Sequence, residues 1–116
     1  MTNINYTIRE YLWNKLGSIR CDHVTDNGRD FTGFRIENSK LNRYEAVCFK
    51  QSDIASQGEF LYTLVVTMDD DGNFLEAERE GKFACSLIES DIPFEVMSRF
   101  RRLMELKQEF DSLKDK

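Results

Sequence analysis

The most regular polar pattern in the chain is acidic. Residues 69–80 read DDDGNFLEAERE, so three aspartates are followed by three glutamates at alternate positions. Alternate residues of a strand share one face at a spacing of about 6.7 Å, so the glutamates would form a row of negative charge. Such a row fits a solvated outer strand protected from edge pairing, or an acidic surface that docks into a basic groove of a partner. The candidate interaction surface consists of Asp69, Asp70, Asp71, Glu76, Glu78 and Glu80.

The same segment shares several positions with a calcium-binding loop. The residues at the first, third, fifth and twelfth loop positions are Asp69, Asp71, Asn73 and Glu80. The sixth position must turn sharply and is normally glycine, but here it is Phe74, which begins an alternating run. We therefore predict a turn between strands and no bound metal.

A second candidate surface is the arginine cluster Arg99, Arg101 and Arg102 near the end of the chain. On a helix Arg99 and Arg102 share a side, and Arg101 can pair with Glu105 one turn later. The cluster fits an ordinary solvated helix face, or a contact with an anion or RNA. Acidic neighbours dilute its positive charge, and the aromatic residue within it, Phe100, belongs to the apolar stripe of the predicted helix.

Three cysteines limit the redox and metal chemistry. Cys21, Cys48 and Cys85 are an odd number without a C-x-x-C pair, and each lies in an apolar or alternating run. This pattern is typical of reduced, structural thiols in a cytosolic protein. The alternative is a zinc site formed by the three cysteines with His23, whose ligand types suit zinc. Structural zinc sites usually draw closely spaced ligand pairs from loops, so we predict no metal site.

No catalytic constellation is visible. His23 is the only histidine, and the chain has no phosphate-binding glycine loop, no H-E-x-x-H and no G-x-S-x-G motif. Most acid–base catalysis near neutral pH depends on histidine. We predict no catalytic residue and no cofactor, and keep an enzyme as an alternative.

The charge balance narrows the class of partner. The chain has 116 residues, with 16 Lys and Arg against 21 Asp and Glu, which gives a net charge of −5. That balance argues against a generally basic nucleic-acid binder. No apolar stretch of about 18 residues is present, and the first residues lack the basic and apolar regions of a secretory signal. We therefore predict a cytoplasmic protein without membrane contact.

Helical periodicity marks both ends of a predicted single α+β domain over residues 1–116. Apolar residues four positions apart predict a short helix at about 6–16, begun by a capping box at Thr7 and ended by Gly17. A second apolar stripe predicts a long C-terminal helix at about 92–113, packed on the sheet.

Between the helices, alternation predicts an antiparallel sheet of five or six strands within about 18–89, joined as hairpins and a meander. The first arm is expected at 19–25, and Asn27-Gly28 is the strongest hairpin signal. The runs 44–49 and 60–68 are apolar on both faces, which is typical of interior strands.

Two helices on the same side of such a sheet would leave an apolar face open. Exposed apolar patches larger than a few hundred Å² usually mark an interface. We therefore expect a protein partner or a homodimer to cover that face, unless the sheet curls on itself or one helix lies on each side.

The function predicted is a small acidic protein-binding module, such as an adaptor, chaperone or inhibitor. One form of it is an antagonist of a nucleic-acid-handling protein, because a basic groove attracts a fixed line of negative charge. One alternative is an enzyme or small-ligand-binding protein with a pocket between the sheet and the last helix. That pocket would be lined by Tyr62, Phe83, Phe100 and Met104. Another is an RNA-binding module that uses the arginine cluster.

Overall fold

The computed structural model describes residues 4–51, 58–81 and 84–113. They form an α+β fold, with a helix at each end of the chain and six strands between them. The elements are α1 (Ile4–Arg20), β1 (Val24–Asp26), β2 (Arg29–Asn38), β3 (Arg43–Lys50), β4 (Glu59–Met68), β5 (Phe74–Glu80), β6 (Cys85–Leu87), a short 3-10 turn η1 (Glu89–Asp91), and α2 (Phe94–Ser112).

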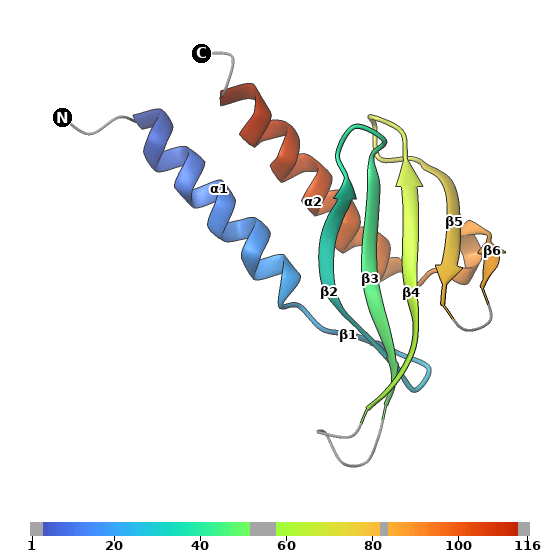
Figure 1. Cartoon of the computed structure of the whole chain (residues 1–116). Coiled ribbons are helices and arrows are strands. Elements are labelled where there is room, and N and C mark those ends of the chain that lie inside the picture. The colour runs from blue at the N-terminus through green and yellow to red at the C-terminus, as the bar shows by residue number, and fades with distance from the viewer. Residues whose placement is uncertain (1–3, 52–57, 82–83, 114–116) are drawn as a thin grey trace.

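The strands form one antiparallel sheet in which chain order and spatial order are the same, β1 to β6. Figure 1 shows α1 and α2 side by side on one side of this sheet, running in opposite directions. The predicted fold class is therefore confirmed. Both helices cover the same face, so the other face of β2 to β5 carries no helix.

The first helix is longer than predicted. It begins before Thr7 and continues through Gly17 to Arg20, so neither proposed boundary is correct. A glycine inside a helix costs roughly 0.5–1 kcal/mol. Burial of Ile19 offsets that cost, because Ile19 lies on the same helical side as buried Leu12. The predicted strand at 19–25 is consequently reduced to the three residues of β1.

The hairpin signal at Asn27-Gly28 is confirmed. Asp26 pairs with Arg29 across the turn. Asn27 has a φ of 49° and Gly28 a φ of 76°. The two-residue hairpin turn that matches the twist of the strands requires a positive φ at both central residues. Asparagine followed by glycine adopts these angles at low energetic cost.

The core lies between the two helices and the face of the sheet they cover. Phe100 of α2 is its centre and is fully buried. Its ring makes an edge contact with Phe34 of β2, with 5.7 Å between centroids, and a tilted contact with Tyr44 of β3 at 6.2 Å. Aromatic pairs in these geometries add to the large area that each ring buries.

We expect Phe100→Ala to lower the free energy of unfolding by about 3–5 kcal/mol, because it leaves a cavity at the centre of the core. The matched control is Phe94→Ala at the start of the same helix, where the side chain is 75% exposed and the expected change is within about 0.5 kcal/mol. Urea unfolding followed by circular dichroism compares the two. Equal losses would contradict the placement of α2 against the sheet.

Tyr44 predicts a sensitivity to alkaline pH. Burial of the phenol, with a smaller effect of the Asp70 charge, raises its pKa to about 12. An unfolded tyrosine has a pKa near 10, so the stabilisation is complete below about pH 10 and declines as pH rises toward 12. Tyr44→Phe should therefore lose less stability between about pH 9 and pH 11 than the wild type, by about 1 kcal/mol in urea unfolding. Equal losses would contradict a buried, titrating phenol.

Candidate functional site

The glutamate row lies on the face of the sheet that no helix covers. Glu76, Glu78 and Glu80 of β5 pair with Thr67, Val65 and Thr63 of β4, so all three point to one side of the sheet. Val66 and Leu64, which alternate with these partners, belong to the core on the opposite side. All three glutamates are exposed. The sequence thus predicted both the strand and the shared face of these carboxylates.

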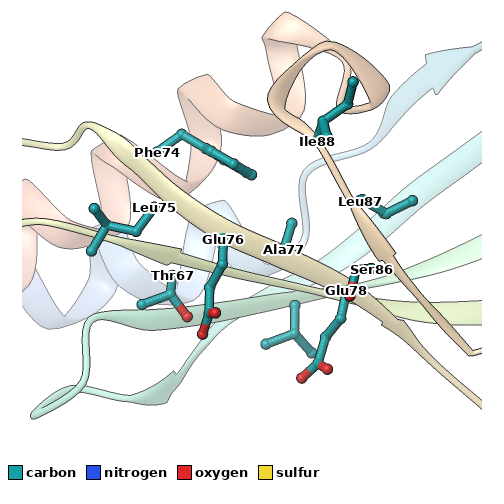
Figure 2. Close-up of a pocket in the computed structure, with 10 residues that line it drawn as sticks. Thr67, Phe74, Leu75, Glu76, Ala77, Glu78, Ser86, Leu87 and Ile88 are labelled. Carbon is teal, nitrogen blue, oxygen red and sulfur yellow. The ribbon is translucent and has the colours of Figure 1, made fainter.

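An apolar groove borders the row at the outer edge of β5. The three residues of β6 pair only with residues 77–79, so residues 74–76 have no partner strand on that side. The groove has a volume of about 280 Å³ and is lined by apolar and acidic side chains, among them Phe74, Leu75, Glu76, Leu87 and Ile88. Figure 2 shows Glu76 and Glu78 pointing to the same side of β5 at this edge.

A β-bulge gives the groove one of its exposed apolar residues, Leu75. Thr67 pairs with Glu76 and Met68 with Phe74, so Leu75 is an extra residue without a partner on β4. Its side chain is 58% exposed, and Ile88 across the groove is 65% exposed. Bulges interrupt strand pairing and re-aim side chains, and they are common at sheet edges and beside functional sites.

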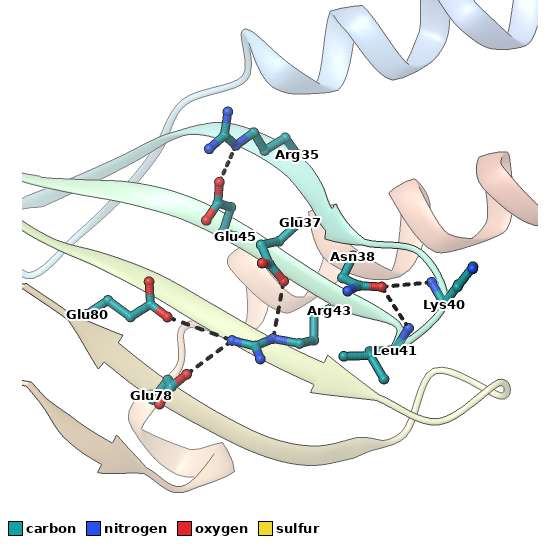
Figure 3. A network of polar contacts seen from close by, with 9 residues as sticks. All are labelled: Arg35, Glu37, Asn38, Lys40, Leu41, Arg43, Glu45, Glu78 and Glu80. Carbon is teal, nitrogen blue, oxygen red and sulfur yellow. Dashed lines mark hydrogen bonds and ion pairs between the residues drawn. The ribbon is translucent and has the colours of Figure 1, made fainter.

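Arg43 of β3 organises the centre of the uncovered face. Its guanidinium forms ion pairs with Glu37 on β2 at 3.2 Å and, on β5, with Glu78 at 3.2 Å and Glu80 at 3.7 Å. Figure 3 shows these contacts extending across β4. Arg43 was not predicted from the sequence as a site residue. Its position two residues before Glu45, with opposite charges on one strand face, was the available signal.

The uncovered face is charged, which corrects the expectation that it would be apolar. Arg35 pairs with Glu45, and Glu45 lies opposite Val65. Only 2% of Val65 is exposed although no helix lies over it. Glu45 is itself only 8% exposed, so its carboxylate is held by Arg35 in a largely buried position beside the valine.

The three aspartates have separate roles. Asp69 Oδ1 accepts hydrogen bonds from the backbone N–H groups of Asp71 and Asn73, both at 2.9 Å. These bonds, led by those from Asn73, lower the pKa of Asp69. Asp70 Oδ1 accepts a hydrogen bond from Asn42 Nδ2 at 2.7 Å, while Asp71 is exposed on the turn. Asp69 therefore holds the β4–β5 turn, and the other two add charge beside the glutamate row.

The arginines of α2 each have a partner within the chain. Arg99 contacts Asp22 at 3.0 Å and Glu95 at 2.9 Å, and Arg101 donates to the Gly72 carbonyl at 2.9 Å. It is Arg102, not Arg101, that pairs with Glu105, at 3.2 Å. The spacing alone allowed either pairing. The contact to the β4–β5 turn decided it, because it draws Arg101 toward the sheet.

The cysteines are dispersed. Cys21 follows α1 and is exposed, Cys48 is buried in the core, and Cys85 is exposed on β6. Burial raises the pKa of the Cys48 thiol. Over the part of the chain that the structure describes, no group of three or more His, Cys, Asp or Glu residues is placed to hold a metal ion.

Three of the four residues predicted to line a pocket between sheet and helix, Tyr62, Phe100 and Met104, belong to the same buried core. Tyr62 lines a separate cleft beside β6, with Arg29 and Arg79. Phe83 lies outside the described residues.

Searches against protein-family models, curated proteins and solved structures found no match. Of the helices in the described ranges, neither is long and apolar enough to cross a membrane. The proposal for its function therefore rests on the structure of the chain itself.

Asp69→Ala should lower the melting temperature, because two backbone N–H groups of the β4–β5 turn lose their acceptor. Asp71→Ala is the matched control, since the Asp71 side chain is exposed. The lowered pKa of Asp69 means that its contribution is present above the unfolded pKa, near 4, and is lost as pH falls through the folded value. Melting curves at neutral pH and at about pH 3 should therefore show a difference between wild type and Asp69→Ala that shrinks in acid. A constant difference would contradict the role of the ionised carboxylate.

Proposed function

We propose that this protein is a protein-binding module that acts through the uncovered sheet face at β5, and that its partner presents a basic surface. The observation that carries the proposal is the exposed row Glu76, Glu78 and Glu80 on the face that no helix covers. An adaptor, chaperone or inhibitor would use such a row without any catalytic step.

The charge of this face favours a basic partner. Five glutamates point from it, at positions 37, 45, 76, 78 and 80, against the two arginines Arg35 and Arg43. Both arginines are already paired with glutamates. Glu76 forms no ion pair with any residue in the described ranges, so its carboxylate is available to a partner. At physiological salt, charges act over about 8 Å, so neighbouring carboxylates of the row reinforce one another.

The groove supplies an apolar contact beside the charge. Leu75 and Ile88 are exposed on its two sides. Interfaces commonly combine an apolar centre with a polar rim, and charge complementarity mainly sets the rate and specificity of association. A partner segment with apolar and basic side chains would match both parts.

Nucleic acid itself is disfavoured as the ligand of this face, because phosphates and carboxylates repel. A protein that handles nucleic acid fits better, since its basic groove can accept the glutamate row in place of phosphates. The alternative of direct RNA binding by α2 lacks support, because Arg99, Arg101 and Arg102 all have partners within the chain.

The test is affinity capture from a native lysate, followed by identification and purification of the retained protein. Its dissociation constant is then measured by calorimetry with the wild type and with the triple variant Glu76→Gln, Glu78→Gln, Glu80→Gln. Three lost interfacial charges should weaken binding by at least about 10-fold at low salt, and added salt should weaken the wild-type complex more than the variant complex.

The matched control has three helical glutamates changed to glutamine: Glu10, Glu105 and Glu109. It carries the same change in net charge, and all three positions are exposed. It should bind like the wild type. Equal weakening by both triple variants would show that overall charge matters and that the β5 row does not. Binding unaffected by either variant would overturn the proposal.

A further inference from the structure

Cys85 has an unusual neighbour for an exposed thiol. One guanidinium, that of Arg79 on the adjacent strand β5, donates two hydrogen bonds to its Sγ, from Nε at 3.1 Å and from Nη2 at 3.0 Å. A thiol is a weak acceptor, whereas a thiolate is a strong acceptor and is the nucleophilic form. A cationic fork held on the sulfur by strand pairing therefore stabilises the reactive state.

Arg79 has few competing partners. It forms no ion pair with a carboxylate of the described chain, and its guanidinium lies 5.3 Å from the centroid of the Tyr62 ring. The hydrogen bonds that Arg79 donates to the Cys85 sulfur raise the pKa of Arg79, so this contact favours the charged guanidinium. This arrangement differs from the other arginines of the sheet, such as Arg35 and Arg43, which contact carboxylates.

The pair lies in a cleft large enough for a small molecule. Its volume is about 690 Å³, within the range typical of small-ligand sites. A second guanidinium lines it: Arg29 donates to the Tyr62 hydroxyl at 3.1 Å and pairs with Asp26 at 3.2 Å. Asp26 and Asp91 also line the cleft, so two carboxylates accompany the two guanidiniums, and the Asp91 carboxylate accepts the N–H of Ile88 at 3.0 Å.

The cleft lies on the opposite side of the sheet from the glutamate row. Arg79 pairs with Leu64, a core residue on the helix side, whereas Glu78 and Glu80 point to the uncovered side. Residues of η1 and the two residues that connect it to α2, Ile92 and Pro93, close one wall. Arg79 and the glutamate row thus face opposite sides of the sheet, while Ser86 and Leu87 of β6 line both the cleft and the groove.

We propose that Cys85 is a reactive thiol that forms mixed disulfides with small anionic disulfides bound in this cleft. The Cys85 thiolate attacks one sulfur of the disulfide, the original S–S bond breaks, and the other sulfur leaves as a thiolate that takes up a proton from water. Arg79 stabilises the attacking thiolate, and Arg29 offers positive charge to the anionic group of the incoming molecule. A second thiol reverses the reaction by the same steps.

The chain contains its own comparison thiols. Cys21 is exposed like Cys85, but no guanidinium of the described ranges contacts its sulfur. Cys48 is buried in the core and should react only when the protein unfolds. In the folded protein the reaction therefore compares two exposed thiols, of which Cys85 accepts hydrogen bonds from a guanidinium.

The probe is dithiobis(nitrobenzoate), an anionic aromatic disulfide whose released thiolate is coloured. Rates are measured near neutral pH with Cys21→Ser, which leaves Cys85 exposed, and with Cys85→Ser, which leaves Cys21 exposed. Cys85 should react at least about 10-fold faster than Cys21. Arg79→Gln in the Cys21→Ser background should remove most of that advantage. Similar reaction rates of Cys85 and Cys21 in these two cysteine variants would by themselves overturn the proposal.

Anion selectivity is tested with hydroxyethyl disulfide, a neutral reagent. Arg29→Gln should slow the reaction of Cys85 with the anionic reagent and leave the reaction with the neutral one unchanged. Loss of both rates to the same extent would show that Arg29 supports the fold and does not receive the anionic group. Circular dichroism and melting curves confirm that each variant compared is folded.

Discussion

The arrangement depends on one constraint: both helices bury their apolar sides against the same face of a single sheet. Leu12 and Ile19 of α1 and Phe100 of α2 converge on that face, and α1 packs against α2 beside them. The opposite face of β4 still carries valine, because strand propensity favours β-branched residues at the centre of a sheet. Val65 lies between Glu45 of β3 and Glu78 of β5, which form ion pairs with Arg35 and Arg43, so charged side chains flank a valine that is almost fully buried.

Sequence patterns predicted local structure well and side-chain partners poorly. The run predicted at 60–68 agrees with β4 to within one residue, and Asn27-Gly28 fixed the first hairpin because its requirement is local. The predicted end of the first helix at Gly17 was wrong. A glycine ends a helix only where the residues after it gain nothing by staying helical, but here Ile19 is buried in the core by residues far along the chain. The Arg43 ion pairs involve β2 and β5 together, so their geometry exists only after three strand pairings have formed.

The bulges explain why the candidate site could be predicted only in part. Alternation places Glu76, Glu78 and Glu80 on one face whatever strand they pair with. It cannot place Leu75, because an extra residue is defined only against the partner strand. The same holds for Leu61: Cys48 pairs with Tyr62 and Phe49 with Phe60, so Leu61 is the unpaired residue. As a result Phe60 packs on Phe49, with 6.0 Å between ring centroids, and does not continue the core row of β4.

Strand β5 separates two kinds of chemistry by the simplest property of a strand, the alternation of its side chains. Glu78 and Arg79 are adjacent in sequence and therefore face opposite sides of the sheet. A guanidinium within the glutamate row would have been neutralised by carboxylates, as Arg43 is. On the other side Arg79 contacts the Tyr62 ring and the Cys85 sulfur and forms no ion pair with a carboxylate of the described residues. A change confined to one face of β5 should therefore affect the proposed partner binding or the proposed thiol reactivity separately, because Glu78 and Glu80 point away from the side on which Arg79 lies.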